Sequence, residues 1–128
     1  MEKTAKVLLV DDDKDFVTAT KTILESRGYQ VITAPQGEAG LVKASQEKPD
    51  LIILDVIMPV KDGFSVAEQL RGDKQLSKIP VIMLTGFSHK VGKTSIPVSR
   101  GLDLKDEYYL EKPVTPEKLL SIVEKKLE

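Results

Sequence analysis

Short runs of apolar residues alternate along the chain with longer segments in which apolar residues recur at helical spacing. The runs 7–10 and 51–54 are continuously apolar, which is typical of strands buried on both faces. Segment 29–34 is rich in β-forming residues, and segments 81–84 and 108–110 indicate two further short strands. The pattern therefore predicts five strands.

Helical spacing predicts an amphipathic helix after each of the first three strands. Asp13 is placed to cap the first of these helices, which should end at Gly28. The second helix spans 37–47 and is weakened by Gly40, because glycine disfavours helix interiors. The third helix runs through Leu70.

The last helix begins at Thr115 and Pro116, because threonine is a good N-cap and proline suits the first helical position. Strands that alternate with helices imply a parallel sheet covered on both faces and joined by right-handed crossovers. We therefore predict a single α/β domain, residues 1–128, with a doubly wound sheet of five parallel strands.

Composition narrows the class of protein. The 128 residues include 19 basic and 20 acidic residues, for a net charge of −1, so no direct nucleic-acid or membrane partner is expected. The chain has no cysteine, which excludes disulfides and thiolate metal sites. No long apolar segment follows the N-terminus, so we expect no signal peptide, no membrane span and a cytoplasmic location.

Polar side chains that can carry chemistry follow four of the predicted strands. They are Asp11, Asp12 and Asp13 after the first strand, Asp55 after the third, Thr85 after the fourth and Lys112 after the fifth. Open α/β sheets bind ligands at the carboxyl ends of their strands, so these groups should meet at one edge. Converging carboxylates repel one another unless a cation joins them, and their oxygens suit Mg²⁺. A hydroxyl and an ammonium would hold phosphoryl oxygens, so the set predicts a phosphoryl-transfer site with a carboxylate nucleophile. Any one aspartate could be an ordinary loop residue, and Asp13 is expected only to cap its helix.

Four segments give a more specific indication. They are VLLVDDDKDF (7–16), KPDLIILDVIMPVKDG (48–63), IPVIMLTG (79–86) and YYLEKPVTPEKLL (108–120). In this order they resemble the signature segments of response-regulator receiver domains, the CheY-like family, over nearly the whole chain. The resemblance implies a flavodoxin-like sheet with the strand order 2-1-3-4-5.

The resemblance also implies a catalytic site. Asp55 would accept a phosphoryl group from a sensor histidine kinase or a phosphotransfer protein, in a chain that is not itself a turnover enzyme. Asp12 would bind Mg²⁺ directly and Asp11 largely through water, together with Asp55 and the backbone carbonyl of Ile57. Lys112 would pair with Asp55 and then with the phosphoryl group.

A switch is implied as well. Thr85 would move toward the phosphoryl group while the ring of Tyr109 moves inward, which would change a partner-binding face around residues 86–112. A downstream output protein or domain would read that face.

The region of the fourth helix departs from the family pattern. Lys112 comes 27 positions after Thr85, which is farther than in most members. Pro97 falls where a helix interior is expected, at a cost of about 3 kcal/mol. We therefore expect a short, broken or mobile fourth helix. Gly40 is a smaller departure, because the family prefers alanine there.

Other functions fit the sequence less well. Gly92-Lys93-Thr94 resembles the end of a P-loop, but five residues, where that motif has four, separate Gly86 from Gly92. An aspartate-nucleophile phosphatase of the haloacid dehalogenase type needs a second acid where this chain has Ile57. A flavodoxin-like FMN site needs a hydroxyl-rich phosphate loop where this chain has three aspartates. His89, the only histidine, is expected to be a solvated loop residue.

Two output classes stay open. The chain could be a free-standing regulator or phosphorelay shuttle, or it could be the receiver module of a longer regulator with a separate output domain. It stops at its last predicted helix without a linker, which slightly favours the free-standing form.

Overall fold

The computed structural model describes residues 4–55, 63–85, 109–111 and 114–127. In chain order the elements are β1 (Lys6–Val10), α1 (Lys14–Ser26), β2 (Gln30–Ala34), α2 (Gly37–Glu47), β3 (Leu51–Asp55), α3 (Gly63–Arg71), the 3-10 helix η1 (Leu76–Lys78), β4 (Val81–Thr85), β5 (Tyr109–Glu111) and α5 (Pro116–Leu127). All five predicted strands and four predicted helices are present. The bounds of α2 are those that the sequence predicted.

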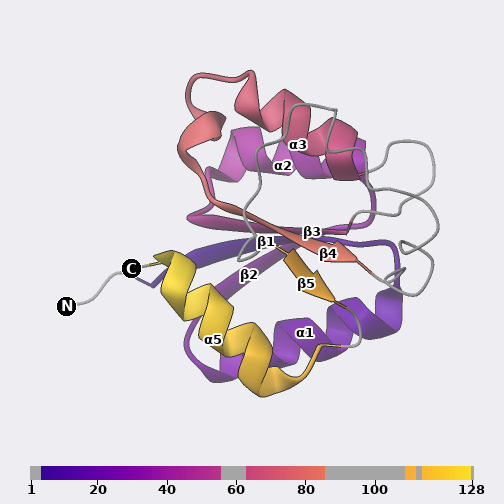
Figure 1. Cartoon of the computed structure of the whole chain (residues 1–128), viewed down its shortest axis with the longest axis vertical. Coiled ribbons are helices and arrows are strands. Elements are labelled where there is room, and N and C mark those ends of the chain that lie inside the picture. Colours follow the sequence, from indigo (N-terminus) through magenta and orange to yellow (C-terminus); the bar gives the residue numbers. More distant parts are fainter. Residues whose placement is uncertain (1–3, 56–62, 86–108, 112–113, 128) are drawn as a thin grey trace.

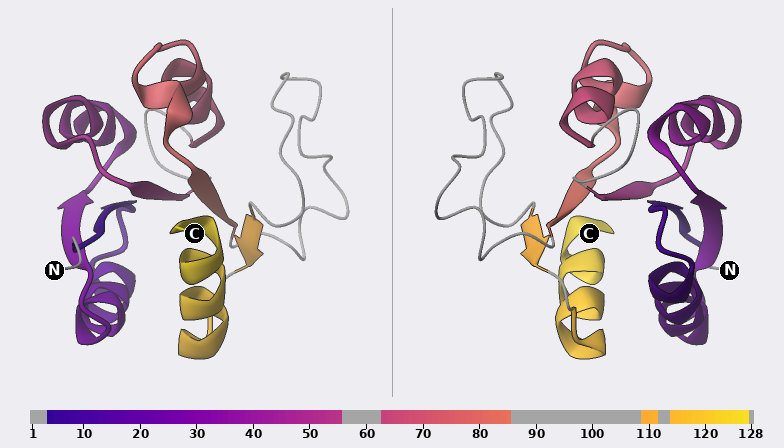
Figure 2. Two further views of the ribbon diagram at one scale, coloured as in Figure 1. Left: turned by 90° about the vertical axis from the view of Figure 1, so that its left-hand side faces the viewer. Right: turned by 90° about the vertical axis from the view of Figure 1, so that its right-hand side faces the viewer.

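The five strands form one parallel sheet in the order β2-β1-β3-β4-β5, which confirms the order implied by the family resemblance. Helices α2 and α3 cover one face of this sheet, and α1 and α5 cover the other (Figures 1 and 2). The strands run in the same direction, so their carboxyl ends lie along one edge. The expected atypical fourth helix falls within residues 86–108, which lie outside the described residues.

The core has two layers because successive residues of a strand point to opposite faces of the sheet. Leu8 and Val10 of β1 pack toward α2 and α3, whereas Val7 and Leu9 pack toward α1 and α5. All four side chains are at most 1% exposed. The continuous apolar run that predicted a strand buried on both faces is therefore confirmed.

Local sequence explains where the first two helices begin and end. The carboxylate of Asp13 accepts hydrogen bonds from the backbone N–H groups of Asp15 and Phe16, so its predicted role as a helix cap is confirmed. After α1, Gly28 adopts a φ of 88°, which favours glycine. Helix α2 ends at Glu47, and its C-cap Lys48 adopts a left-handed φ of 48° before Pro49.

Gly40 has a packing role that the sequence did not indicate. A Cβ atom added at this position would lie 2.8 Å from Cγ2 and 3.0 Å from Cγ1 of Val10. Carbon atoms in contact are normally about 3.5–4.0 Å apart. Glycine therefore lets α2 lie close to β1, in addition to lowering the helix propensity of α2.

Candidate functional site

The site is built at the carboxyl edge of the sheet, where β1 and β3 end side by side. Val10 and Leu54 are partners in the ladder between these strands, so Asp11 and Asp55 follow in register. Asp11 is 2% exposed and Asp55 is 5% exposed. Buried carboxylates are costly unless hydrogen bonds or cations compensate them, so two of them at one edge indicate a functional role.

Backbone hydrogen bonds fix the loop that carries the acidic residues. The N–H of Asp11 donates to the carbonyl oxygen of Ala34 at 3.1 Å, which ties the end of β1 to the end of β2. The N–H of Asp13 donates to Oδ1 of Asp11 at 2.9 Å. The Asp11 carboxylate is therefore oriented before any ligand binds.

Three carboxylates converge at this edge. Asp11, Asp12 and Asp55 each offer an oxygen atom, and these atoms lie within 4.8 Å of one another. Asp12 is exposed while the other two are buried, so the group opens to solvent on one side. Asp13 lies next in the chain, but its carboxylate binds the first turn of α1. The structure thus brings together the three aspartates predicted as metal ligands.

The other predicted site residues are described only in part. Thr85 is the last residue of β4 and the ladder partner of Glu111, which immediately precedes Lys112 in the chain. Tyr109 begins β5, one residue later than the predicted strand start. Ile57 and Lys112 lie outside the described residues. The backbone therefore brings Thr85 to the same edge as Asp55, which pairs with Leu84.

A cleft of about 300 Å³ opens beside the acidic residues. The residues that line it include Asp11, Asp12, Lys14, Thr33 and Pro35. Sequence reasoning missed the last three residues. The rule that ligands bind at carboxyl ends of strands could have identified Thr33 and Pro35, because they lie at the end of β2.

The donor set fits a hard divalent cation. All three candidate ligands are carboxylates, and Mg²⁺ prefers oxygen ligands in an octahedral shell that retains water. The exposed side at Asp12 leaves room for water and for a phosphoryl group. An ion here would offset the mutual repulsion of the carboxylates and would bind the oxygens of a transferring phosphoryl group.

Comparisons with known proteins agree with this geometry. The family profile of the response regulator receiver domain matches residues 7–124. The alkaline phosphatase synthesis transcriptional regulatory protein PhoP of Bacillus subtilis is 44% identical over 111 residues, which are 87% of this chain and 43% of PhoP. Protein PilH of Pseudomonas aeruginosa is 36% identical over 119 residues, which are 93% of this chain and 94% of PilH. This chain spans less than half the length of the curated transcriptional regulators it matches.

Solved structures give the same result. The chemotaxis response regulator CheY4 of Vibrio cholerae matches 98% of this chain and all of its own, with a TM-score of 0.82 and 34% identity. The receiver domain of sensor histidine kinase PA1611 from Pseudomonas aeruginosa matches 98% of both chains, with a TM-score of 0.83 and 26% identity. That structure has a magnesium ion coordinated in its active site cleft.

No helix among the described residues is long and apolar enough to cross a membrane. The profile match covers nearly the whole chain, the strand order is that of the CheY-like fold, and three aspartates meet at the carboxyl edge. The chain therefore belongs to the response regulator receiver domain family of two-component signalling.

Proposed function

We propose that this chain, as a receiver domain over residues 1–128, accepts a phosphoryl group on Asp55 from a phosphohistidine of a sensor histidine kinase or phosphotransfer protein. One observation carries the proposal. Asp55 is 5% exposed and lies at the carboxyl edge with Asp11 and Asp12, whose carboxylate oxygens are within 4.8 Å of its own. A nearly buried carboxylate among other carboxylates suits a nucleophile that is activated by a metal ion.

The transfer step conserves atoms and electrons. A carboxylate oxygen of Asp55 attacks phosphorus and forms an O–P bond, while the N–P bond breaks and its electron pair stays on the imidazole nitrogen of the donor. Asp11, Asp12, Asp55 and the carbonyl oxygen of Ile57 would hold Mg²⁺, and the bound ion would neutralise charge on the phosphoryl oxygens. Lys112 and the Thr85 hydroxyl would bind the remaining oxygens.

Phosphorylation would act as a switch. An acyl phosphate carries more negative charge and more acceptor oxygens than a carboxylate, so it offers Thr85 and Lys112 new partners. We propose that Thr85 and Tyr109 then change together and alter a partner-binding face around residues 86–112. The chain would be a phosphoacceptor that takes part in its own phosphorylation and dephosphorylation, and it would not turn over a substrate.

Relatives of two lengths correspond to the two proposed forms of output. PilH is about the length of this chain, whereas PhoP is more than twice as long and is a transcriptional regulatory protein. If this chain works as a free-standing regulator of the length of PilH, it would act through a separate output protein. If it is the receiver module of a longer regulator such as PhoP, it would act through an attached output domain.

Phosphorylation by a small donor tests the proposal. The protein is incubated with acetyl phosphate and Mg²⁺, and its intact mass is measured. We expect a single phosphoryl adduct that needs Mg²⁺, is absent from Asp55→Asn and persists in Asp15→Asn, a matched control on the exposed first turn of α1. A folded protein without an adduct would refute the proposal, as would an adduct that persists in Asp55→Asn. Multiple-turnover hydrolysis of phosphomonoesters would favour the phosphatase alternative.

A further inference from the structure

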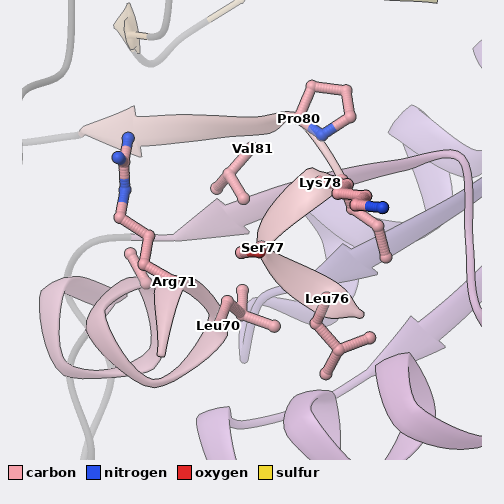
Figure 3. Close-up of a pocket in the computed structure, with 9 residues that line it drawn as sticks. Leu70, Arg71, Leu76, Ser77, Lys78, Pro80 and Val81 are labelled. Carbon is pink, nitrogen blue, oxygen red and sulfur yellow. The ribbon is translucent and has the colours of Figure 1, made fainter. Parts of the chain in front are cut away.

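A second hollow lies at the start of β4, at the edge of the sheet opposite the acidic cluster. Figure 3 shows residues that line it. It has a volume of about 240 Å³ and lies between the end of α3, η1 and the start of β4. We call it the α3–η1 groove. Its lining includes Leu70, Arg71, Leu76, Lys78, Pro80 and Val81.

The floor of the α3–η1 groove carries half-buried apolar residues, Pro80 and Val81, and polar atoms share its surface. Leu70 and Leu76 are 2% and 6% exposed and belong to the core cluster beneath α3, against which Ile79 and Val81 pack. Two backbone hydrogen bonds from Gln75 and Leu76 to Oδ1 of Asp73 fix the start of η1. The groove is therefore bounded by elements that pack into the core.

Two cations flank this floor. Arg71 and Lys78 are exposed, and Figure 3 shows them on opposite sides of the groove, with Ser77 and Val81 between them. Neither side chain forms a salt bridge with another described residue. The nearby carboxylate of Asp73 already accepts the two N–H bonds of η1. The rim therefore offers positive charge on both sides of this floor.

The size of the groove selects the kind of ligand. Pockets for drug-sized molecules and cofactors are usually about 300–1,000 Å³, which is larger than this groove. A groove of 240 Å³ suits one anchoring side chain of a partner protein, the arrangement in which interface binding energy is concentrated. Charges on either side of the anchor then select the partner through electrostatic complementarity.

We propose that the α3–η1 groove docks a segment of a partner protein in which an apolar side chain stands between acidic residues. The apolar side chain enters the groove against Pro80 and Val81, which are half-buried. The flanking carboxylates pair with Arg71 on one side and Lys78 on the other.

Docking at this groove leaves the acidic cluster accessible. Val81, at the groove, pairs with Ile52, whereas Leu84 pairs with Asp55. Three residues of strand separate the two positions, which is about 10 Å at the usual rise of a strand. The groove therefore binds its partner with or without phosphorylation, and the proposal does not rest on the role of Asp55.

Binding of designed peptides tests the proposal. A panel of fluorescein-labelled 12-residue peptides carries a central Leu, Ile, Met or Phe between acidic residues, and a matched panel carries lysine in place of the acids. Binding is measured by anisotropy without Mg²⁺ or phosphodonor. We expect at least one acidic peptide to bind with a Kd below about 1 mM and no lysine peptide to match it. In NMR spectra, the backbone amide signals whose chemical shifts change on peptide binding should belong to residues 67–81.

Charge reversal supplies the decisive comparison. The double variant Arg71→Glu, Lys78→Glu should bind the acidic peptide about tenfold more weakly than the wild type and should bind its lysine counterpart more tightly. Lys74→Glu is the matched control, because Lys74 is exposed in the segment between α3 and η1 but does not line the groove. Failure of every acidic peptide to bind, or an equal loss in Lys74→Glu, would overturn the proposal. Dimerisation of the chain that the double variant abolishes would assign the groove to a second copy and would also overturn it.

Discussion

Gly40→Ala should have two opposing effects on the stability of the fold, because the added methyl group favours helix α2 but crowds Val10. Helix α2 lies so close to β1 that a Cβ at position 40 would be 2.8 Å from Cγ2 of Val10. Ordinary carbon contacts begin at about 3.5 Å, so Val10 or the helix must move by roughly 0.7 Å. Val10 is 1% exposed and precedes Asp11, so it cannot turn toward solvent.

The net effect follows from the two contributions. Replacing glycine by alanine within a helix stabilises it by about 1 kcal/mol, whereas overpacking a core costs about 1–3 kcal/mol. We therefore expect Gly40→Ala to lower the free energy of unfolding by about 1 kcal/mol. In a Val10→Ala background the methyl group fills vacated space, and the same substitution should raise that free energy by about 1 kcal/mol. The coupling energy between the two sites is then about 2 kcal/mol.

Urea unfolding followed by circular dichroism measures all four proteins of this cycle, because the chain has no tryptophan for fluorescence. Gly72→Ala is the control, since its Cβ would make ordinary contacts of 3.6 and 3.7 Å with the carbonyl oxygens of Glu68 and Gln69. It should be neutral or stabilise by up to about 1 kcal/mol. If Gly40→Ala stabilises both backgrounds equally, the contact with Val10 does not limit residue size at position 40.

Three other predictions concern the metal site, a helix cap and a tyrosine. Mg²⁺ at ten times its Kd should stabilise the wild type by about 1.4 kcal/mol in thermal unfolding; Asp12→Asn should weaken this shift, and an undiminished shift would exclude Asp12 as a ligand. Asp13→Ala should cost about 1 kcal/mol in urea unfolding because it removes the cap of α1; Asp13→Asn should retain most of that stability, and an equal loss would contradict the capping role. Burial, assisted by the negative charge of Glu124, raises the pKa of Tyr29 above 10.0 in the folded protein. The stability that the neutral side chain of Tyr29 contributes is complete below pH 10 and is lost as the pH rises through the folded pKa. Above pH 10 the free energy of unfolding of the wild type should therefore fall relative to that of Tyr29→Phe. A difference in unfolding free energy that is independent of pH would contradict this.

The sequence predicted the central strands well because they are continuous apolar runs. A run such as 51–54 has no polar residue that a helix could expose, and Pro80 marks the start of the next strand. The cluster of Asp11, Asp12 and Asp55 was predictable for a related reason. Parallel strands in register bring the residues that follow them to one edge, whatever the loops do.

Features that depend on distance between elements were not predictable. Gly40 looked only like a weakness of α2, because its contact with Val10 arises from how the helix lies on the sheet. The α3–η1 groove was missed because η1 is a single 3-10 turn, too short to show a hydrophobic period. Its lining comes from the end of a helix and the start of a strand, whose proximity only the fold determines.

The identity of the phosphorylated residue tests the central claim most directly. Borohydride reduces an aspartyl phosphate to homoserine, which peptide mass spectrometry locates in the chain. After treatment with acetyl phosphate and Mg²⁺, we expect homoserine at position 55 and only there, with none when Mg²⁺ is removed. Homoserine at position 11 or 12, or its absence from a protein that carries the phosphoryl adduct, would contradict the assignment of Asp55 as the phosphoacceptor.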